Sequence, residues 1–183
     1  MGGEGPAGRP LHRLRAREPP IVLPGFNPTR SDMTIEIGQP APAFSLPDTN
    51  NEQVTLESLR GNKTLLVFIP FPFTSVCTGE LCELQESLGQ LEELGSNVVA
   101  ITCDTRFAND AWAKQEGIEY PVLSDYWPHG ETSKAYGVFN DSLGAAMRST
   151  FVLNAHGRVT DVIRSEEILV ARQFEDYLTA LSN

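Results

Sequence analysis

A cysteine stands at the junction between an expected strand and an expected helix, where a thiol can become reactive. Residues 65–69 form an apolar run typical of a buried strand, and apolar residues recur three or four apart over residues 79–94, as on one helical face. Cys77 therefore falls in the first helical turn. Unpaired backbone N–H groups and the positive end of the helix dipole favour an anion there, so the nucleophilic thiolate is stabilised.

A second cysteine, Cys82, follows Cys77 after four intervening residues rather than the two of a Cys-x-x-Cys redox pair. In an intact helix, residues five apart have Cα atoms about 8 to 9 Å apart, beyond the roughly 7 Å limit for a disulfide. A bridge between the two cysteines therefore requires this part of the helix to unwind. Two cysteines without a neighbouring histidine are also a poor zinc site, and we expect no metal and no cofactor.

The composition points to one domain that acts on a small molecule. A chain of 183 residues with 40% hydrophobic content can build a single core. The net charge of -10 argues against nucleic acid or an anionic membrane as a partner, and no apolar run approaches the ~20 residues of a membrane span. Three cysteines without a secretory signal favour a reducing compartment, so we expect a cytoplasmic protein.

The first 32 residues differ from the rest of the chain. They are rich in glycine and proline, lack periodicity and contain five arginines against three acids, so they carry +2 while residues 33–183 carry -12. We expect a disordered tail over residues 1–32 and a folded domain over residues 33–183. A transit peptide is one alternative, although its prolines would break an amphipathic helix; a true start at Met33 is another.

The remaining pattern predicts an α/β domain with a central mixed sheet flanked by helices. An early hairpin is expected over residues 44–46 and 53–56, with a helical turn at 56–59. A strand at 64–69, a helix at 78–94, a strand at 98–102, a helix at 107–115 and a short strand around Val122 then alternate. A second hairpin over residues 148–153 and 159–163 and an amphipathic helix over 170–181 close the chain.

This order of elements is similar to the thioredoxin fold, and the residues around Cys77 resemble those of the peroxiredoxin family. The family signature Pro-x-x-x-Thr-x-x-Cys is matched by Pro70, Thr74 and Cys77, with a glutamate following as Glu80 and the family's second-half arginine as Arg148. Segments 123–130 and 135–140 resemble the alkyl hydroperoxide reductase E subgroup of mycothiol-using bacteria. The resemblance covers about residues 34–181.

The resemblance implies a thiol-dependent peroxidase that acts on hydrogen peroxide and organic hydroperoxides. Cys77 would attack the terminal peroxide oxygen, and the site must stabilise both the thiolate and the charge that builds on the leaving oxygen. The expected substrate-binding groups are the Thr74 hydroxyl, the backbone N–H groups near Val76 and Cys77, and the Arg148 guanidinium. Pro70 would shape and shield the loop, and Glu80 would position Arg148 or the loop.

The product at Cys77 is a sulfenic acid, which a second thiol must resolve before further peroxide overoxidises it. The alkyl hydroperoxide reductase E subgroup typically lacks a resolving cysteine, whereas a cysteine five residues on is the pattern of the bacterioferritin-comigratory (Q-type) peroxiredoxins. The resemblance thus implies that Cys82 resolves, with a thioredoxin-like or mycoredoxin-like reductant; direct reduction by a small thiol such as mycothiol is the alternative. Cys103 ends the strand at 98–102 and is expected to be structural, with resolution by Cys103 in place of Cys82 as the alternative.

The sequence leaves two other functional classes open. A thiol-disulfide oxidoreductase is disfavoured because the chain has no Cys-x-x-Cys motif. A redox-sensing or chaperone-like oligomer could use the same fold as a binding surface. The resemblance further implies a homodimer or a larger homo-oligomer, with the segment that contains Trp127 and His129 near subunit contacts.

Overall fold

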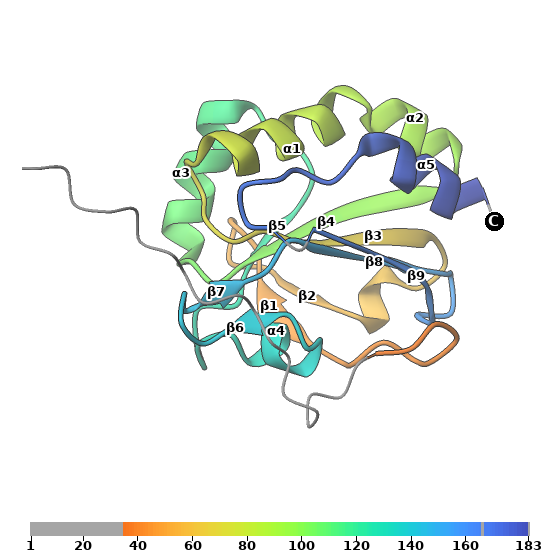
Figure 1. The fold of residues 1–183 in the computed structure, drawn as a ribbon, viewed down its shortest axis with the longest axis horizontal. Coiled ribbons are helices and arrows are strands. Elements are labelled where there is room, and N and C mark those ends of the chain that lie inside the picture. The colour runs from red at the N-terminus through yellow and green to blue at the C-terminus, as the bar shows by residue number, and fades with distance from the viewer. Residues whose placement is uncertain (1–34, 166, 183) are drawn as a thin grey trace, which may run out of the picture.

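The computed structural model describes residues 35–165 and 167–182, so the tail predicted over residues 1–32 lies outside the described residues. Its centre is a mixed sheet of five strands (Figure 1). In spatial order these are β5 (Val122–Ser124), β4 (Ser96–Thr102), β3 (Lys63–Phe68), β8 (Ser149–Leu153) and β9 (Val159–Arg164). Strands β3, β4 and β5 are parallel, while β8 and β9 run antiparallel to their neighbours. The predicted mixed α/β sheet is therefore confirmed.

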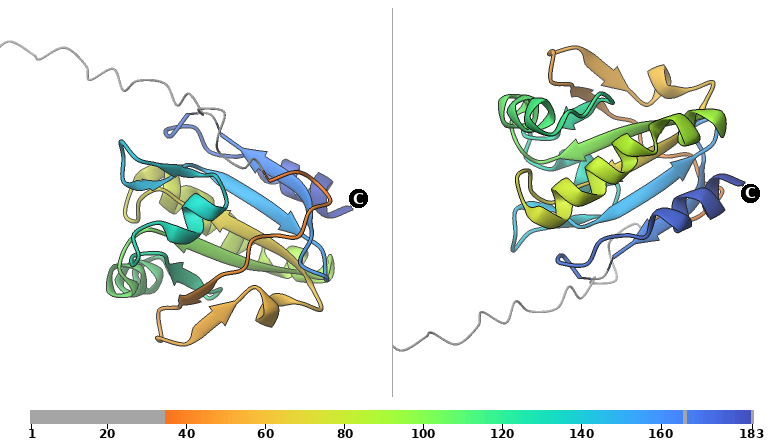
Figure 2. Two further views of the ribbon diagram at one scale, coloured as in Figure 1. Left: turned by 90° about the horizontal axis from the view of Figure 1, so that it is seen from below. Right: turned by 90° about the horizontal axis from the view of Figure 1, so that it is seen from above.

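The two faces of the sheet bury different layers because successive side chains of a strand point to opposite sides. Leu65 and Val67 of β3 belong to the core under the helices, whereas Leu66 and Phe68 belong to the core of the other face. Helices α1 (Ser75–Glu86), α2 (Leu88–Glu93) and α5 (Phe174–Ser182) lie over the first face (Figure 1). Helix α3 (Arg106–Glu116) stands beside β5 and adds Trp112 and Ala113 to the same core. The view from above in Figure 2 shows α1 and α2 lying along the sheet.

The second face is covered by short elements (Figure 1). They are the antiparallel strands β1 (Ser45–Pro47) and β2 (Gln53–Thr55), the 3-10 turn η1 (Glu57–Leu59), helix α4 (Glu131–Ala135), and the two-residue strands β6 (Phe139–Asn140) and β7 (Ala145–Ala146). Tyr136, directly after α4, packs its ring 5.2 Å from that of Phe68 and 5.0 Å from that of Phe151. The predicted N-terminal hairpin is present, whereas α4, β6 and β7 were not predicted.

Two predicted helices differ from the observed ones. The helix expected over residues 78–94 begins earlier, at Ser75, and is divided at Ser87, whose ψ of 6° departs from helical geometry. The closing helix begins at Phe174 rather than at residue 170. Arg172 is not helical because its backbone N–H donates to the Glu80 side chain at 2.9 Å, and this long-range contact overrides the local pattern. No helix within residues 35–165 and 167–182 combines the length and apolarity needed to cross a bilayer.

The topology brings two distant segments to one edge of the sheet. Strand β3 ends at Phe68 and leads into α1, which carries Cys77. Strand β8 runs in the opposite direction, and its first residue, Ser149, pairs with Phe68. Arg148, directly before β8, therefore lies beside the loop that precedes α1.

Candidate active site

The start of α1 offers unpaired backbone donors around Cys77. Thr74 is the N-cap residue with extended backbone angles, and the first helical hydrogen bond runs from Thr78 N to Thr74 O at 2.9 Å. The N–H groups of Ser75, Val76 and Cys77 precede that bond, so the helix supplies no acceptor for them. Together with the helix dipole they favour negative charge on a group at this position.

Arg148 holds the Cys77 sulfur directly. Its Nη2 donates to Cys77 Sγ at 3.1 Å, its Nη1 donates to Glu80 Oε2, and its Nε donates to Ile168 O at 2.7 Å. Arg148 is only 2% exposed and Cys77 is fully buried. The three contacts fix the plane of the guanidinium, so a permanent positive charge faces the sulfur in one orientation.

A second arginine, which the sequence pattern did not reveal, completes the support of this site. Arg172 donates to Glu80 Oε1 from its backbone N and from its Nε, both at 2.9 Å. Its Nη1 donates to Phe68 O at 3.2 Å and to Thr150 Oγ1 at 3.0 Å. The two oxygens of Glu80 are thus divided between Arg148 and Arg172. The sequence offered no signal for this pairing, because the partners lie 92 residues apart and Arg172 fell within an expected helix.

The charges of this cluster balance when Cys77 is a thiolate. Arg148 and Arg172 carry two positive charges and Glu80 one negative charge, and all three residues are buried. A buried charge is costly unless it is paired. A thiolate at Cys77, whose sulfur lies 3.1 Å from Arg148 Nη2, would supply the second negative charge.

The other two signature residues lie in the loop between β3 and α1. Pro70 is buried, and Thr74 is exposed. The Thr74 hydroxyl donates to Phe71 O at 3.0 Å. Since its hydrogen is engaged in this bond, the Thr74 oxygen keeps lone pairs that can accept a hydrogen bond from a peroxide O–H group.

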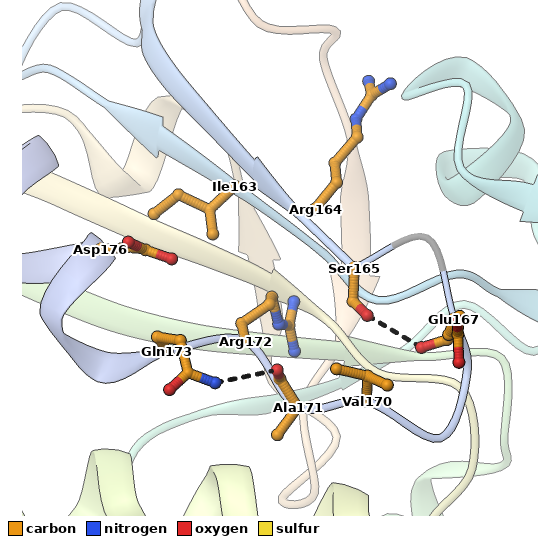
Figure 3. A pocket seen from close by; sticks show the side chains of 9 residues that line it. All are labelled: Ile163, Arg164, Ser165, Glu167, Val170, Ala171, Arg172, Gln173 and Asp176. Carbon is orange, nitrogen blue, oxygen red and sulfur yellow. Dashed lines mark hydrogen bonds between the residues drawn. The ribbon is translucent and has the colours of Figure 1, made fainter.

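A cavity of about 360 Å³ lies beside this arginine cluster, between the end of β9 and the segment before α5 (Figure 3). Ser165, Val170 and Arg172 are among the residues that line it, and neither Cys77 nor Arg148 does. Ser165 Oγ donates to Glu167 O at 2.8 Å across its rim. The cavity therefore borders the support of the site without opening onto the thiol.

Cys82 lies further along α1, partly exposed and without a disulfide. Its thiol is 4.0 Å from Glu116 Oε2 at the end of α3. Burial raises the pKa of the Cys82 thiol, and the carboxylates of Glu116 and Glu86 raise it further. Cys82 is therefore held as a thiol, a poor nucleophile, while α1 is intact.

Replacing Glu116 by glutamine is expected to make Cys82 react faster with iodoacetamide near neutral pH, by roughly two- to threefold. The carboxylate raises the pKa of the thiol, so its removal lowers that pKa and increases the thiolate fraction. The rate is measured against pH in a Cys77→Ser, Cys103→Ser background, which leaves Cys82 as the one cysteine. The two profiles should converge at high pH, where both thiols are ionised. Equal rates at neutral pH, or the same gain in a control Glu92→Gln, would contradict the prediction.

Cys103 has a different environment. It is buried directly after β4, and its sulfur lies 3.6 Å from Ser133 Oγ of α4. Burial is the largest cause that raises the pKa of the Cys103 thiol. Its neighbour α4 covers the face of the sheet opposite to α1, which carries the other two cysteines (Figure 1).

Comparison with known proteins finds one family, close relatives in sequence and solved structures with the same fold. Residues 37–162 match the model of the AhpC/TSA family. The chain is 42% identical to alkyl hydroperoxide reductase E of Mycobacterium tuberculosis over 151 residues, which are 81% of this chain and 99% of that protein. Among solved structures, AhpC of Enterococcus faecalis superposes with a TM-score of 0.75 at 27% identity, covering 82% of this chain and 92% of that one. Peroxidoxin BcpB of Mycobacterium tuberculosis superposes with a TM-score of 0.71 at 28% identity, covering 81% and 95%.

Proposed function

The chain belongs to the AhpC/TSA family and is a peroxiredoxin-type thiol peroxidase with a thioredoxin-like fold, and from that premise we propose that it reduces hydrogen peroxide and organic hydroperoxides through Cys77. The observation that carries the proposal is the 3.1 Å contact from Arg148 Nη2 to Cys77 Sγ at an uncapped helix start. Such a site stabilises a thiolate and presents donors beside it.

In the proposed first step, the Cys77 thiolate attacks the terminal oxygen of the hydroperoxide. An S–O bond forms, the O–O bond breaks, and the leaving hydroxide or alkoxide takes up a proton to give water or an alcohol. The sulfur is oxidised to a sulfenic acid. Negative charge moves from the sulfur to the leaving oxygen, and a guanidinium that reaches both atoms stabilises that charge.

The remaining donors and acceptors of the loop would orient the peroxide. The Thr74 oxygen accepts a hydrogen bond from the O–H group of the attacked oxygen. The backbone N–H groups of Val76 and Cys77 face the negative charge that the thiolate and the peroxide share. Pro70 closes the loop behind the sulfur and adds no competing donor. Glu80 and Arg172 act through Arg148 and are positioning residues.

We further propose that Cys82 resolves the sulfenic acid. Both cysteines lie in α1, and their helical separation of about 8 to 9 Å is too long for a disulfide, so the segment between them must unwind. The Cys82 thiolate then attacks the Cys77 sulfur, an S–S bond forms, and hydroxide leaves and becomes water. A thioredoxin-like or mycoredoxin-like protein would reduce the disulfide through a mixed disulfide.

The competing route is reduction of the sulfenic acid by an outside small thiol such as mycothiol. The 42% identity to an alkyl hydroperoxide reductase E, over nearly the whole of that protein, supports this route. That subgroup typically lacks a resolving cysteine, so its members depend on an outside thiol. The two routes leave products of different mass on the protein, so one experiment separates them.

The test mixes the reduced protein rapidly with one equivalent of hydrogen peroxide and follows both the peroxide and the intact mass. We expect peroxide to disappear orders of magnitude faster than with free cysteine, and Cys77→Ser serves as the inactive control. The final mass should fall by two hydrogens, and in Cys82→Ser it should instead rise by one oxygen.

Each readout can fail separately. Peroxide consumption no faster than that of free cysteine, unchanged in Cys77→Ser, would overturn the peroxidase proposal. Fast consumption with a stable gain of one oxygen in the unmutated protein would overturn Cys82 as the resolving cysteine and favour the small-thiol route.

A further inference from the structure

Helix α1 is held by hydrogen bonds from α3 and the segment that follows it. Trp112 Nε1 donates to Thr78 Oγ1 at 3.0 Å, and the Tyr120 hydroxyl donates to Leu81 O at 2.9 Å. One turn further on, the backbone N–H of Glu119 donates to Gln85 Oε1 at 2.8 Å. None of these contacts involves the thiol, the peroxide donors or the arginine cluster.

Two of these bonds bracket the segment that separates the cysteines. Thr78 directly follows Cys77, and Leu81 directly precedes Cys82. Trp112 thus holds one end of the segment and Tyr120 holds the other, while Leu81 itself is fully buried in the core. Unwinding residues 78–81 breaks both bonds.

The Trp112 donor is carried by a helix that is anchored to the sheet. Helix α3 begins at the N-cap Thr105, whose side chain accepts from Ala108 N, and ends at Gly117 in the left-handed conformation. Its Asn109 accepts from Thr102 Oγ1 at 2.8 Å and donates to Leu123 O at 3.2 Å, which ties α3 to β4 and β5. A donor on so well anchored an element resists opening of its partner rather than following it.

We propose that Trp112 and Tyr120 hold the segment 78–81 closed and thereby set the rate at which the Cys77 sulfenic acid is resolved by Cys82. This inference rests on the proposed internal disulfide. A slow opening prolongs the life of the sulfenic acid, during which a second peroxide can oxidise it to the sulfinic acid. The two side chains therefore govern how the protein divides between turnover and overoxidation at high peroxide.

The burial of the Tyr120 ring supports its role as a permanent donor. The pKa of the Tyr120 phenol is raised above its ordinary value, mainly by burial, so the hydroxyl stays protonated at physiological pH. Leu81 O also lies inside α1, where residue 85 supplies its regular helical donor. Removing the hydroxyl therefore loosens the segment without leaving a buried carbonyl unpaired.

The test compares Tyr120→Phe with Tyr136→Phe. Tyr136 is a matched control, because its buried hydroxyl also donates to a backbone carbonyl at 2.9 Å, that of Pro42, but on the opposite face of the sheet. We expect Tyr120→Phe to form the disulfide about fivefold faster after one equivalent of peroxide, the change that corresponds to one buried neutral hydrogen bond. The rate of Cys77 oxidation should be unchanged, and less sulfinic acid should form at high peroxide.

Amide hydrogen exchange of the reduced protein gives a readout that needs no disulfide. The peptide over residues 77–85 should exchange about fivefold faster in Tyr120→Phe, and also in Thr78→Val, which removes the acceptor of Trp112. Equal exchange in Tyr120→Phe and the unmutated protein, or the same acceleration in Tyr136→Phe, would overturn the proposal. So would an unchanged rate of disulfide formation. If no disulfide forms in any variant, the internal disulfide itself is wrong, and exchange alone decides whether the segment is held closed.

Discussion

Replacing Arg148 by methionine is expected to slow the oxidation of Cys77 by hydrogen peroxide about 10²- to 10³-fold. The change removes the Nη2 donor that lies 3.1 Å from the sulfur and the positive charge that faces the leaving oxygen. Removal of one such preorganised donor at a site of developing charge has an effect of this size. The second-order rate constant, measured by rapid mixing of the reduced protein with peroxide, gives the result directly.

The fold should survive this change, because Glu80 keeps its two hydrogen bonds from Arg172. Arg148→Lys should fall between the two proteins: a lysine keeps the charge but cannot bind Cys77, Glu80 and Ile168 with one planar group. Arg158→Met is the matched control, since the exposed Arg158 binds Gly38 O far from the thiol and should leave the rate unchanged. A rate for Arg148→Met within threefold of the unmutated protein would show that Arg148 does not stabilise the transition state.

The sequence allowed the prediction of the elements whose signals are local. The apolar run before Cys77 and the three-to-four spacing after it predicted a strand followed by a helix, and β3 and α1 confirm both. The contact between Cys77 and Arg148 spans 71 residues, and only the resemblance to a family linked the two. The structure supplies a physical reason, since the antiparallel pairing of β3 and β8 brings the segments to one edge of the sheet.

The features that escaped prediction depend on long-range contacts. Arg172 and Glu80 are 92 residues apart, and the bond from Trp112 to Thr78 spans 34 residues. Neither pair leaves a trace in hydrophobic periodicity, because a buried arginine within an amphipathic pattern is indistinguishable from one that faces solvent. The early end of α1 at Glu86 was likewise hidden, since the apolar spacing continues unbroken into α2.

Replacing Glu80 by glutamine is expected to lower the free energy of unfolding by about 3 to 5 kcal/mol. Glu80 is the carboxylate that pairs with both Arg148 and Arg172, and all three side chains are buried. Glutamine has nearly the same shape but no charge, so two buried guanidinium groups lose their counter-ion. Denaturant unfolding of the reduced protein measures the change, and its size should not depend strongly on salt because the cluster is shielded from solvent.

Glu83 provides the matched control on the same helix. Its side chain is largely exposed, although partial burial and the carboxylates of Glu175, Glu80 and Glu86 raise its pKa. Glu83→Gln therefore removes a charge that its neighbours repel, and the free energy of unfolding should change by less than about 0.5 kcal/mol. A loss below 1 kcal/mol for Glu80→Gln would mean that the arginines are stabilised by other groups.

The double variant Glu80→Gln, Arg172→Met separates lost charge balance from lost packing. It removes one negative and one positive charge, so the remaining Arg148 can pair with the Cys77 thiolate. If unpaired charge is the cause of the loss, the double variant should be more stable than Glu80→Gln alone, although it also loses the bonds from Arg172 to Phe68 O and Thr150 Oγ1. Peroxide oxidation of Cys77 in this variant should then be slower than in the unmutated protein but faster than in Arg148→Met, because the guanidinium is present but no longer fixed by Glu80.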